Sequence, residues 1–204
     1  MSEPGRQQQE FSREPMTAEE IQAANVGSAP KLDGQVALVE YDPRWPGIFE
    51  REAAAIRARL SGPGCRIEHV GSTSVQGLPA KPVVDMLLIV PDSADEAAYL
   101  PVLEGLGFDL VIREPGWYEH RVLRKYDLGP SADAANLHVL SDGCPEVDRM
   151  LLFRDRLRSD AADRTLYAET KRSLAEQTWE YLQNYADAKT EVVERILARA
   201  GQGT

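Results

Sequence analysis

One acidic residue, Asp85, lies within an otherwise apolar run that extends from Val83 to Val90. A near-continuous apolar run of this length predicts a strand that is buried on both faces of a sheet. A buried, unpaired carboxylate is so costly that it must meet a cation, a metal ion or several hydrogen-bond donors, or else take up a proton. We interpret Asp85 as part of a functional site. The alternative is an Asp that faces a helix N-terminus or a neighbouring Arg.

The composition predicts a globular protein that does not enter a membrane. The chain has 204 residues and a hydrophobic content of 43%, which is enough for a core. Nothing in it approaches the roughly 20 consecutive apolar residues that cross a bilayer, and its polar start lacks the pattern of a signal peptide. We therefore expect a cytoplasmic protein.

The cysteine content and the net charge exclude further kinds of protein and site. Cys65 and Cys144 form no CxxC pair, so a disulfide framework or a zinc knuckle is not expected, and a reducing cytoplasm fits. The formal net charge of −10 argues against extensive, sequence-independent binding to the phosphate backbone of a nucleic acid. A small phosphorylated ligand held by a local basic cluster remains compatible with this balance.

The chain divides into a tail and one domain. Residues 1–33 have scattered apolar residues and predict a flexible tail with a short helix over 18–24. The domain, 34–204, has an α/β core over 34–144 and C-terminal helices over 145–200. We expect strands over 36–40, 66–70, 83–90, 108–114, 120–126 and 136–140, and helices over 47–60 and 94–106. This order predicts an α+β fold in which a mixed sheet packs against helices.

Five motifs carry a family resemblance. They are YDPRWP at 41–46, EHVGSTSVQGLPAKPVVDM at 68–86, NLHVL at 136–140, LLFRDRLR at 151–158 and YADAKTEVV at 185–193. Through them the sequence resembles the GrpB family, an uncharacterised family related to the nucleotidyltransferase superfamily, from about Val36 to Ala198. The resemblance implies a nucleotidyltransferase-like sheet. Such a domain also resembles the C-terminal extension of some bacterial dephospho-CoA kinases.

The superfamily pattern is a Gly-Ser pair, two carboxylates spaced one apart on a strand, and a third carboxylate on a later strand. Gly71, Ser72 and Asp85 match it, whereas Leu87 occupies the second acidic position and His138 stands where the third acid is expected. The resemblance implies that Asp85 and His138 are catalytic and hold Mg²⁺ or Mn²⁺. One carboxylate and one imidazole offer fewer of the oxygen ligands that Mg²⁺ prefers than two or three carboxylates do. A core histidine is the alternative for His138.

The resemblance and the local basic residues also suggest phosphate contacts. The turn of Gly71, Ser72, Thr73 and Ser74 is expected to cradle phosphate, or else to be a plain helix cap. Lys81, at the start of the Asp85 strand, is expected to meet phosphate or to neutralise Asp85.

Two further pairs complete the candidate phosphate site. Arg121 and Lys125 share one face of a predicted strand, as an anion-binding surface or a solvated edge. Tyr185 and Lys189 are four apart on a predicted helix and so lie on one side of it. Superfamily enzymes often direct a helical lysine at the triphosphate, and Lys189 is the candidate. The alternative is an ordinary exposed lysine.

The leading hypothesis is a nucleotidyltransferase-like enzyme that binds ATP or GTP with magnesium and transfers a nucleotidyl group to an unknown small-molecule acceptor. The missing acid at Leu87 favours a second hypothesis, in which a non-catalytic module of the same fold assists a protein partner such as a dephospho-CoA kinase. Modification of nucleic acid is disfavoured by the acidic balance.

Overall fold

The computed structural model describes residues 14–32, 34–60 and 64–201. In chain order, the main helices are α1 (Ala18–Ala24), α2 (Trp45–Arg57), α3 (Leu100–Glu104), α4 (Pro145–Ser159), α5 (Ala161–Ala175), α6 (Leu182–Asp187) and α7 (Thr190–Ala200). The strands are β1 (Arg66–Val70), β2 (Val83–Val90), β3 (Asp109–Glu114), β4 (His120–Tyr126) and β5 (Ala134–Ser141). None of the described helices has the length and hydropathy of a membrane span.

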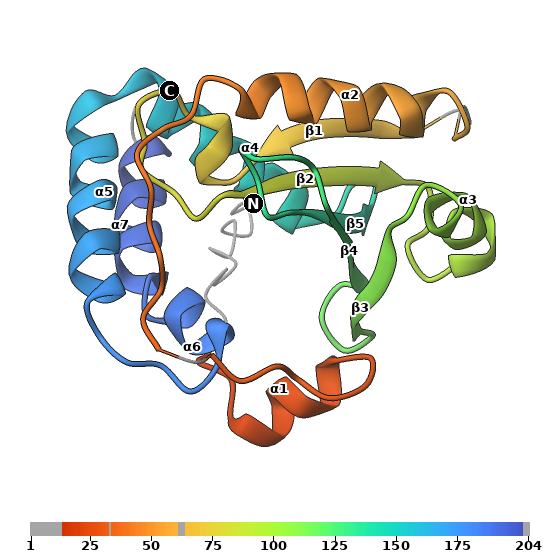
Figure 1. Cartoon of the computed structure of the whole chain (residues 1–204), viewed down its shortest axis with the longest axis horizontal. Helices are drawn as coiled ribbons and strands as arrows, with labels where there is room; N and C mark the ends of the chain where they lie inside the picture. The colour runs from red at the N-terminus through yellow and green to blue at the C-terminus, as the bar shows by residue number, and fades with distance from the viewer. Residues whose placement is uncertain (1–13, 33, 61–63, 202–204) are drawn as a thin grey trace, which may run out of the picture.

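The five strands form one mixed sheet in the order β1-β2-β5-β4-β3. β2 and β5 are parallel, and their register sets Asp85 beside Asn136 and Leu87 beside His138. The other three pairings are antiparallel. Helices pack on the sheet, and α4 to α7 form a C-terminal group (Figure 1). The predicted α+β fold, with a mixed sheet and a helical C-terminal region, is confirmed.

The two faces of the sheet have separate cores. Met86 and Leu88 of β2 pack with α2 and α3. Leu87 and Ile89 face the other way and pack with Val147 of α4. Because side chains alternate along a strand, Asp85 shares the α4 face with Leu87. It lies nearer the start of β2, and its side chain is still 29% exposed.

Several predicted boundaries are confirmed and others are wrong. The bounds of β1, β2 and β4 agree with the prediction, and β3 and β5 are shifted by one or two residues. The predicted strand over 36–40 is reduced to the isolated bridges Gln35–Thr178 and Val39–Ala80. Trp45 and Pro46 begin α2 rather than preceding it, because proline fits the first turn of a helix. The predicted helix over 94–106 is divided into a 3-10 turn and α3, which has Pro101 in its first turn.

The predicted flexible tail is wrong for residues 14–32. α1 has the predicted bounds, with a capping box between Thr17 and Glu20. Ile21 is 4% exposed and packs with Tyr181. The backbone N–H of Val26 donates to Val111 of β3 at 3.0 Å, and Figure 1 shows α1 lying between β3 and α6. Its apolar residues look scattered in the sequence because they contact different elements. Residues 1–13 and 33 of the predicted tail lie outside the described part.

Candidate functional site

A cavity of about 700 Å³ lies between the sheet, the C-terminal helices and the α1 segment. Side chains from β2, β4, β5 and the α6–α7 junction line it, and Ile21 and Asn25 contribute to its N-terminal wall. Six of the residues predicted from the sequence line this cavity: Gly71, Lys81, Asp85, His138, Tyr185 and Lys189. The Asp85 carboxylate and the Gly71 turn therefore open into one shared space.

Gly71 makes the close approach between the turn and β2 possible. Its φ of +66° and ψ of −171° lie in a region that is essentially restricted to glycine. A Cβ atom there would lie 2.5 Å from Asp85 Oδ2 and 2.8 Å from Asp85 Cβ. The Asp85 side chain thus packs directly against the glycine backbone.

The hydroxyls of the same turn are engaged inside the protein. Ser74 Oγ donates to the Gly71 carbonyl at 2.7 Å, and Thr73 Oγ1 lies 3.1 Å from His69 Nε2. Ser72 Oγ accepts a hydrogen bond from Lys171 at 2.9 Å. None of these three hydroxyl residues lines the cavity. The expected cradle of four residues is therefore reduced to Gly71.

Asp85 is held by an amide rather than by a direct ion pair. Asn136 Nδ2 donates to Asp85 Oδ1 at 3.0 Å, and Arg124 Nε donates to Asn136 Oδ1 at 2.8 Å. His138 Nε2 lies 4.0 Å from the same Asp85 oxygen. Sequence reasoning missed Asn136 and Arg124. Asn136 could have been found, because it is two residues before His138 and so shares its face of the strand.

A second histidine stands behind His138. His120 Nε2 lies 3.0 Å from His138 Nδ1, and His120 Nδ1 lies 2.8 Å from Glu114 Oε2. The edge of Trp117 packs on the His120 ring with centroids 5.1 Å apart. Burial and, to a lesser extent, the neighbouring His120 lower the pKa of His138 to about 4. His138 is therefore a neutral imidazole near pH 7.

Three cationic side chains in the cavity have no carboxylate at ion-pair distance among the described residues: Lys81, Arg124 and Lys189. Burial and, to a lesser extent, the charge of Lys81 lower the pKa of Lys189 to about 8. Burial also lowers the pKa of Lys81. An acidic protein has thus gathered, in the cavity that Asp85 lines, three basic side chains for which the described residues provide no carboxylate at ion-pair distance.

Arg121 and Lys125 are not part of this site. Even-numbered residues of β4 face the cavity, so these two odd-numbered residues face α2 and α3 on the opposite side. Arg121 Nε donates to Glu96 at 2.6 Å, and Lys125 Nζ donates to Glu52 at 2.8 Å. The predicted anion-binding surface is therefore a pair of internal ion pairs.

Tyr185 and Lys189 reach the cavity from different helices. α6 ends at Asp187 and α7 begins at Thr190, which leaves Lys189 as the N-terminal cap residue of α7. Lys189 Nζ lies 4.5 Å from the centroid of the Tyr185 ring. The Tyr185 hydroxyl is buried and has no hydrogen-bond partner among the described residues. The predicted single helix is wrong, but both side chains reach the same space.

Lys171 of α5 was missed by sequence reasoning and lies directly beneath the turn. It is 2% exposed and donates to Ser72 Oγ and to the Pro79 carbonyl. Burial and, to a lesser extent, the charges of Lys189 and Arg172 lower its pKa to about 7. Its spacing of four residues from Tyr167 and three from Leu174 places it on the apolar face of the helix, and this spacing could have identified it.

The variant Lys171→Met should reduce the pH dependence of stability. The folded-state pKa of Lys171, about 7, is below the unfolded value of about 10.4. The unfolded state thus binds more protons in this interval, and the free energy of unfolding rises with pH. We expect Lys171→Met to remove on the order of 2 kcal/mol of the rise between pH 7 and pH 9. Urea unfolding at both pH values measures it. The exposed Lys31→Met should leave the rise intact, and an unaltered rise in Lys171→Met would contradict the assignment.

The residues present do not fit a resident Mg²⁺ or Mn²⁺. No group of three His, Cys, Asp or Glu side chains among the described residues is arranged to hold a metal ion. At roughly 2.1 Å from each ligand, adjacent ligands of Mg²⁺ lie about 3 Å apart, whereas Asp85 Oδ1 and His138 Nε2 are 4.0 Å apart. Leu87 is fully buried in the apolar cluster under α4. The expected metal site at Asp85 and His138 is therefore not preformed.

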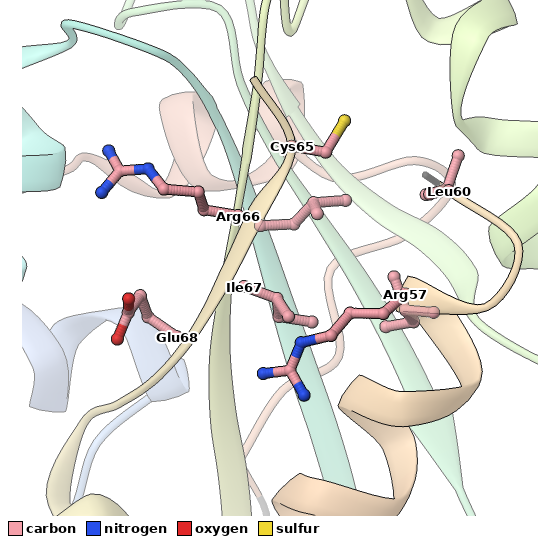
Figure 2. Close-up of a pocket in the computed structure, with 8 residues that line it drawn as sticks. Arg57, Leu60, Cys65, Arg66, Ile67 and Glu68 are labelled. Atoms are coloured by element: carbon pink, nitrogen blue, oxygen red, sulfur yellow. The ribbon is translucent and has the colours of Figure 1, made fainter. Parts of the chain in front are cut away.

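A smaller cavity of about 290 Å³ lies between α2 and β1. Figure 2 shows Arg57, Ile67 and Glu68 around it, with the Cys65 thiol above. None of the predicted site residues lines it. The larger cavity therefore remains the candidate site.

Comparison with known proteins agrees over most of the chain. The family model described as GrpB protein matches residues 35–199. A UPF0157 protein of Halalkalibacterium halodurans is 52% identical over 186 residues, which cover 91% of this chain and 93% of the relative. The crystal structure of the conserved protein GrpB from Enterococcus faecalis is 32% identical with a TM-score of 0.68, and the match covers 81% of this chain and 98% of that one.

Two more distant similarities concern larger proteins. A dephospho-CoA kinase of Mycolicibacterium paratuberculosis is 31% identical over 179 residues, which are 76% of this chain and 43% of the kinase. A cytoplasmic RNA terminal U-transferase is 12% identical with a TM-score of 0.44, over 66% of this chain and 44% of that one. At that distance the second similarity says nothing about activity.

Proposed function

The chain belongs to the GrpB family, and we propose that it binds a nucleoside triphosphate, ATP or GTP, in the large cavity as a nucleotidyltransferase-like protein. The observation that carries the proposal is the group of Lys81, Arg124 and Lys189, which have no carboxylate partner and lie beside Asp85 and the Gly71 turn. Buried or half-buried cations without counterions favour an anionic ligand. The phosphate groups of a triphosphate would supply the negative charge that balances these three cations.

The size and lining of the cavity suit such a ligand. Its volume of about 700 Å³ lies within the usual range for small-molecule sites, roughly 300–1,000 Å³. Gly71 lines the cavity beside Asp85, so a ligand there would lie against the backbone of the turn. The Tyr185 hydroxyl is a buried donor without a partner among the described residues, and it offers a further contact. We propose that the triphosphate lies between Lys81 and Lys189.

The same arrangement supports transfer of the nucleotidyl group to a small-molecule acceptor. The acceptor's nucleophile would attack the α-phosphorus in line, and pyrophosphate would leave. Asp85 and His138 are 4.0 Å apart at the cavity wall, where they would take up the nucleophile's proton. The lysines and Arg124 would stabilise charge on the phosphates, so catalysis would come mainly from positioning and electrostatics.

Calorimetric titration with ATP and with GTP tests the binding site. We expect Lys189→Met to weaken binding roughly 10- to 100-fold, because a hydrogen bond to a charged group contributes about 1.5–3 kcal/mol. Lys125→Met is the matched control, since Lys125 faces the opposite side of the sheet in an ion pair with Glu52. Equal affinities in wild type and Lys189→Met, or an equal loss in both variants, would contradict the proposed site.

A second candidate is a non-catalytic module that assists a partner enzyme. The buried Leu87 at the second acidic position and the dephospho-CoA kinase relative favour it. Pyrophosphate release over a panel of acceptors separates the two. An enzyme should release pyrophosphate and lose that activity in Asp85→Asn. A module should bind nucleotide without release and form a stable complex with a dephospho-CoA kinase that contains no such domain.

A further inference from the structure

A chain of hydrogen bonds leads from a carboxylate on β3 to the cavity wall. Glu114 Oε2 and His120 Nδ1 are 2.8 Å apart, and His120 Nε2 and His138 Nδ1 are 3.0 Å apart. The two imidazole rings are nearly parallel, with an interplanar angle of 11°. His120 and Glu114 are themselves buried, with side chains 7% and 9% exposed. The inference below rests on the proposed function, because it concerns the acceptor of the same site.

This series of hydrogen bonds determines which nitrogen of each imidazole ring carries a proton. An ionised carboxylate only accepts hydrogen bonds, so Glu114 requires the N–H of His120 at Nδ1. When the His120 ring carries only this one proton, its Nε2 has a lone pair, which accepts a hydrogen bond from the Nδ1–H of His138. The remaining nitrogen, His138 Nε2, must carry a lone pair. It is the nitrogen that lies 4.0 Å from Asp85 Oδ1.

Two acceptors therefore face each other across a gap that is too wide for a direct hydrogen bond. Asp85 Oδ1 accepts a hydrogen bond from Asn136 at 3.0 Å, and His138 Nε2 has no hydrogen-bond donor among the described residues. One oxygen or nitrogen at about 2.8 Å from each atom would bridge them. The gap thus suits a donor group of a ligand.

We propose that this gap is the subsite for the nucleophilic O–H or N–H group of the acceptor, and that Glu114 and His120 are positioning residues that keep His138 Nε2 unprotonated. In the transfer step, the bond from the acceptor's oxygen or nitrogen to the α-phosphorus forms while the bond from the α-phosphorus to the bridging oxygen breaks. The nucleophile's proton passes to His138 Nε2, and the electron pair of the broken bond leaves with pyrophosphate. Asp85, with Oδ1 4.0 Å from His138 Nε2, stabilises the resulting imidazolium.

Nitrogen-15 NMR of the free protein tests the tautomer without nucleotide or acceptor. The chain contains three histidines, so a long-range proton–nitrogen spectrum of histidine-labelled protein can be assigned with one variant per ring. In wild type at pH 7 we expect His138 to carry hydrogen on Nδ1 only. Hydrogen on His138 Nε2 in wild type would overturn the proposal.

Two substitutions, one on β3 and one on β4, interrupt the series of hydrogen bonds that leads from Glu114 to His138. His120→Phe keeps an aromatic ring under Trp117 but removes the acceptor for His138 Nδ1–H, and Glu114→Ala removes the acceptor for His120. In each, we expect a substantial fraction of His138 to convert to the tautomer with hydrogen on Nε2. Glu119→Ala is the matched control, because Glu119 pairs with Arg121 on the opposite face. If the His138 tautomer is unchanged in both folded variants, the chain does not set it and the proposal fails.

The outcome is separable from that of the proposed function. Loss of nucleotide binding in wild type would remove the function while leaving the tautomer measurement intact. If nucleotide binds and pyrophosphate is released, His120→Phe should lower kcat at least 10-fold with little change in nucleotide affinity. An unchanged kcat would overturn the positioning role of His120.

Discussion

Replacing Gly71 with alanine should be the most damaging single-methyl change in the site, with a loss of about 2–5 kcal/mol in the free energy of unfolding and no measurable nucleotide binding. Two costs combine. The backbone at φ +66° and ψ −171° is strained for any residue with a side chain. The new Cβ would also lie 2.5 Å from Asp85 Oδ2 and 3.0 Å from Asp85 Cγ. Relief of the clash must displace Asp85 or the turn, and either movement opens the site.

Gly77→Ala separates the two costs. Gly77 has a φ of +78°, but a Cβ there would meet nothing within 4 Å. It should therefore lose only the backbone contribution, about 1 kcal/mol, and should bind nucleotide like wild type. Urea unfolding measures stability, and titration below the unfolding transition measures binding. Similar losses in both variants would show that the contact between Gly71 and Asp85 is not tight.

Local patterns in the sequence predicted the strands of the site but not the way in which they meet. Alternation and apolar runs are local, so β1, β2 and β4 were predicted with their observed bounds. Asp85 was identified because a carboxylate contradicts its apolar surroundings. Arg124 and Asn136 do not stand out in this way from the residues around them in the sequence. They became part of the site only through the order β2-β5-β4, which depends on pairings between distant segments.

The errors in the predicted site have a common physical origin. Arg121 and Lys125 were correctly placed on one face of β4, but the sequence does not say which face meets the cavity. That choice is set by α2 and α3, whose Glu52 and nearby Glu96 accept hydrogen bonds from these cations. Because the prediction concerned the face of Arg121 and Lys125, it missed His120 on the opposite face and with it the histidine pair. The α1 segment likewise needed its partners β3 and Tyr181 to be seen as structure.

Restoring the missing acid with Leu87→Asp should not complete a metal site but should destabilise the fold by about 4 kcal/mol or more. Leu87 is 0% exposed and packs with Val70, Leu140 and Val147 beneath α4. The change removes the apolar contacts of a buried leucine and places a carboxylate among apolar side chains. Chemical unfolding at pH 7 measures the loss.

The pH dependence of this variant identifies the cause. Burial raises the pKa of a carboxyl group, so the folded state of Leu87→Asp binds more protons than the unfolded state above about pH 4. Its free energy of unfolding should therefore fall as pH rises from about 4 to 7. Leu87→Asn is the matched control, because it has nearly the same shape and no titrating group, and it should lose stability by an amount that does not change with pH.

The same pair of variants decides whether the second acidic position belongs to the site at all. If Leu87→Asp keeps wild-type stability and gains affinity for Mn²⁺, the side chain must reach the cavity beside Asp85, and the apolar packing under α4 would be wrong. If Leu87→Asp is less stable than wild type and its free energy of unfolding increases toward low pH, position 87 belongs to the core. In that case the positive side chains Lys81, Arg124 and Lys189, rather than a second carboxylate with its metal, are what the cavity offers to phosphate.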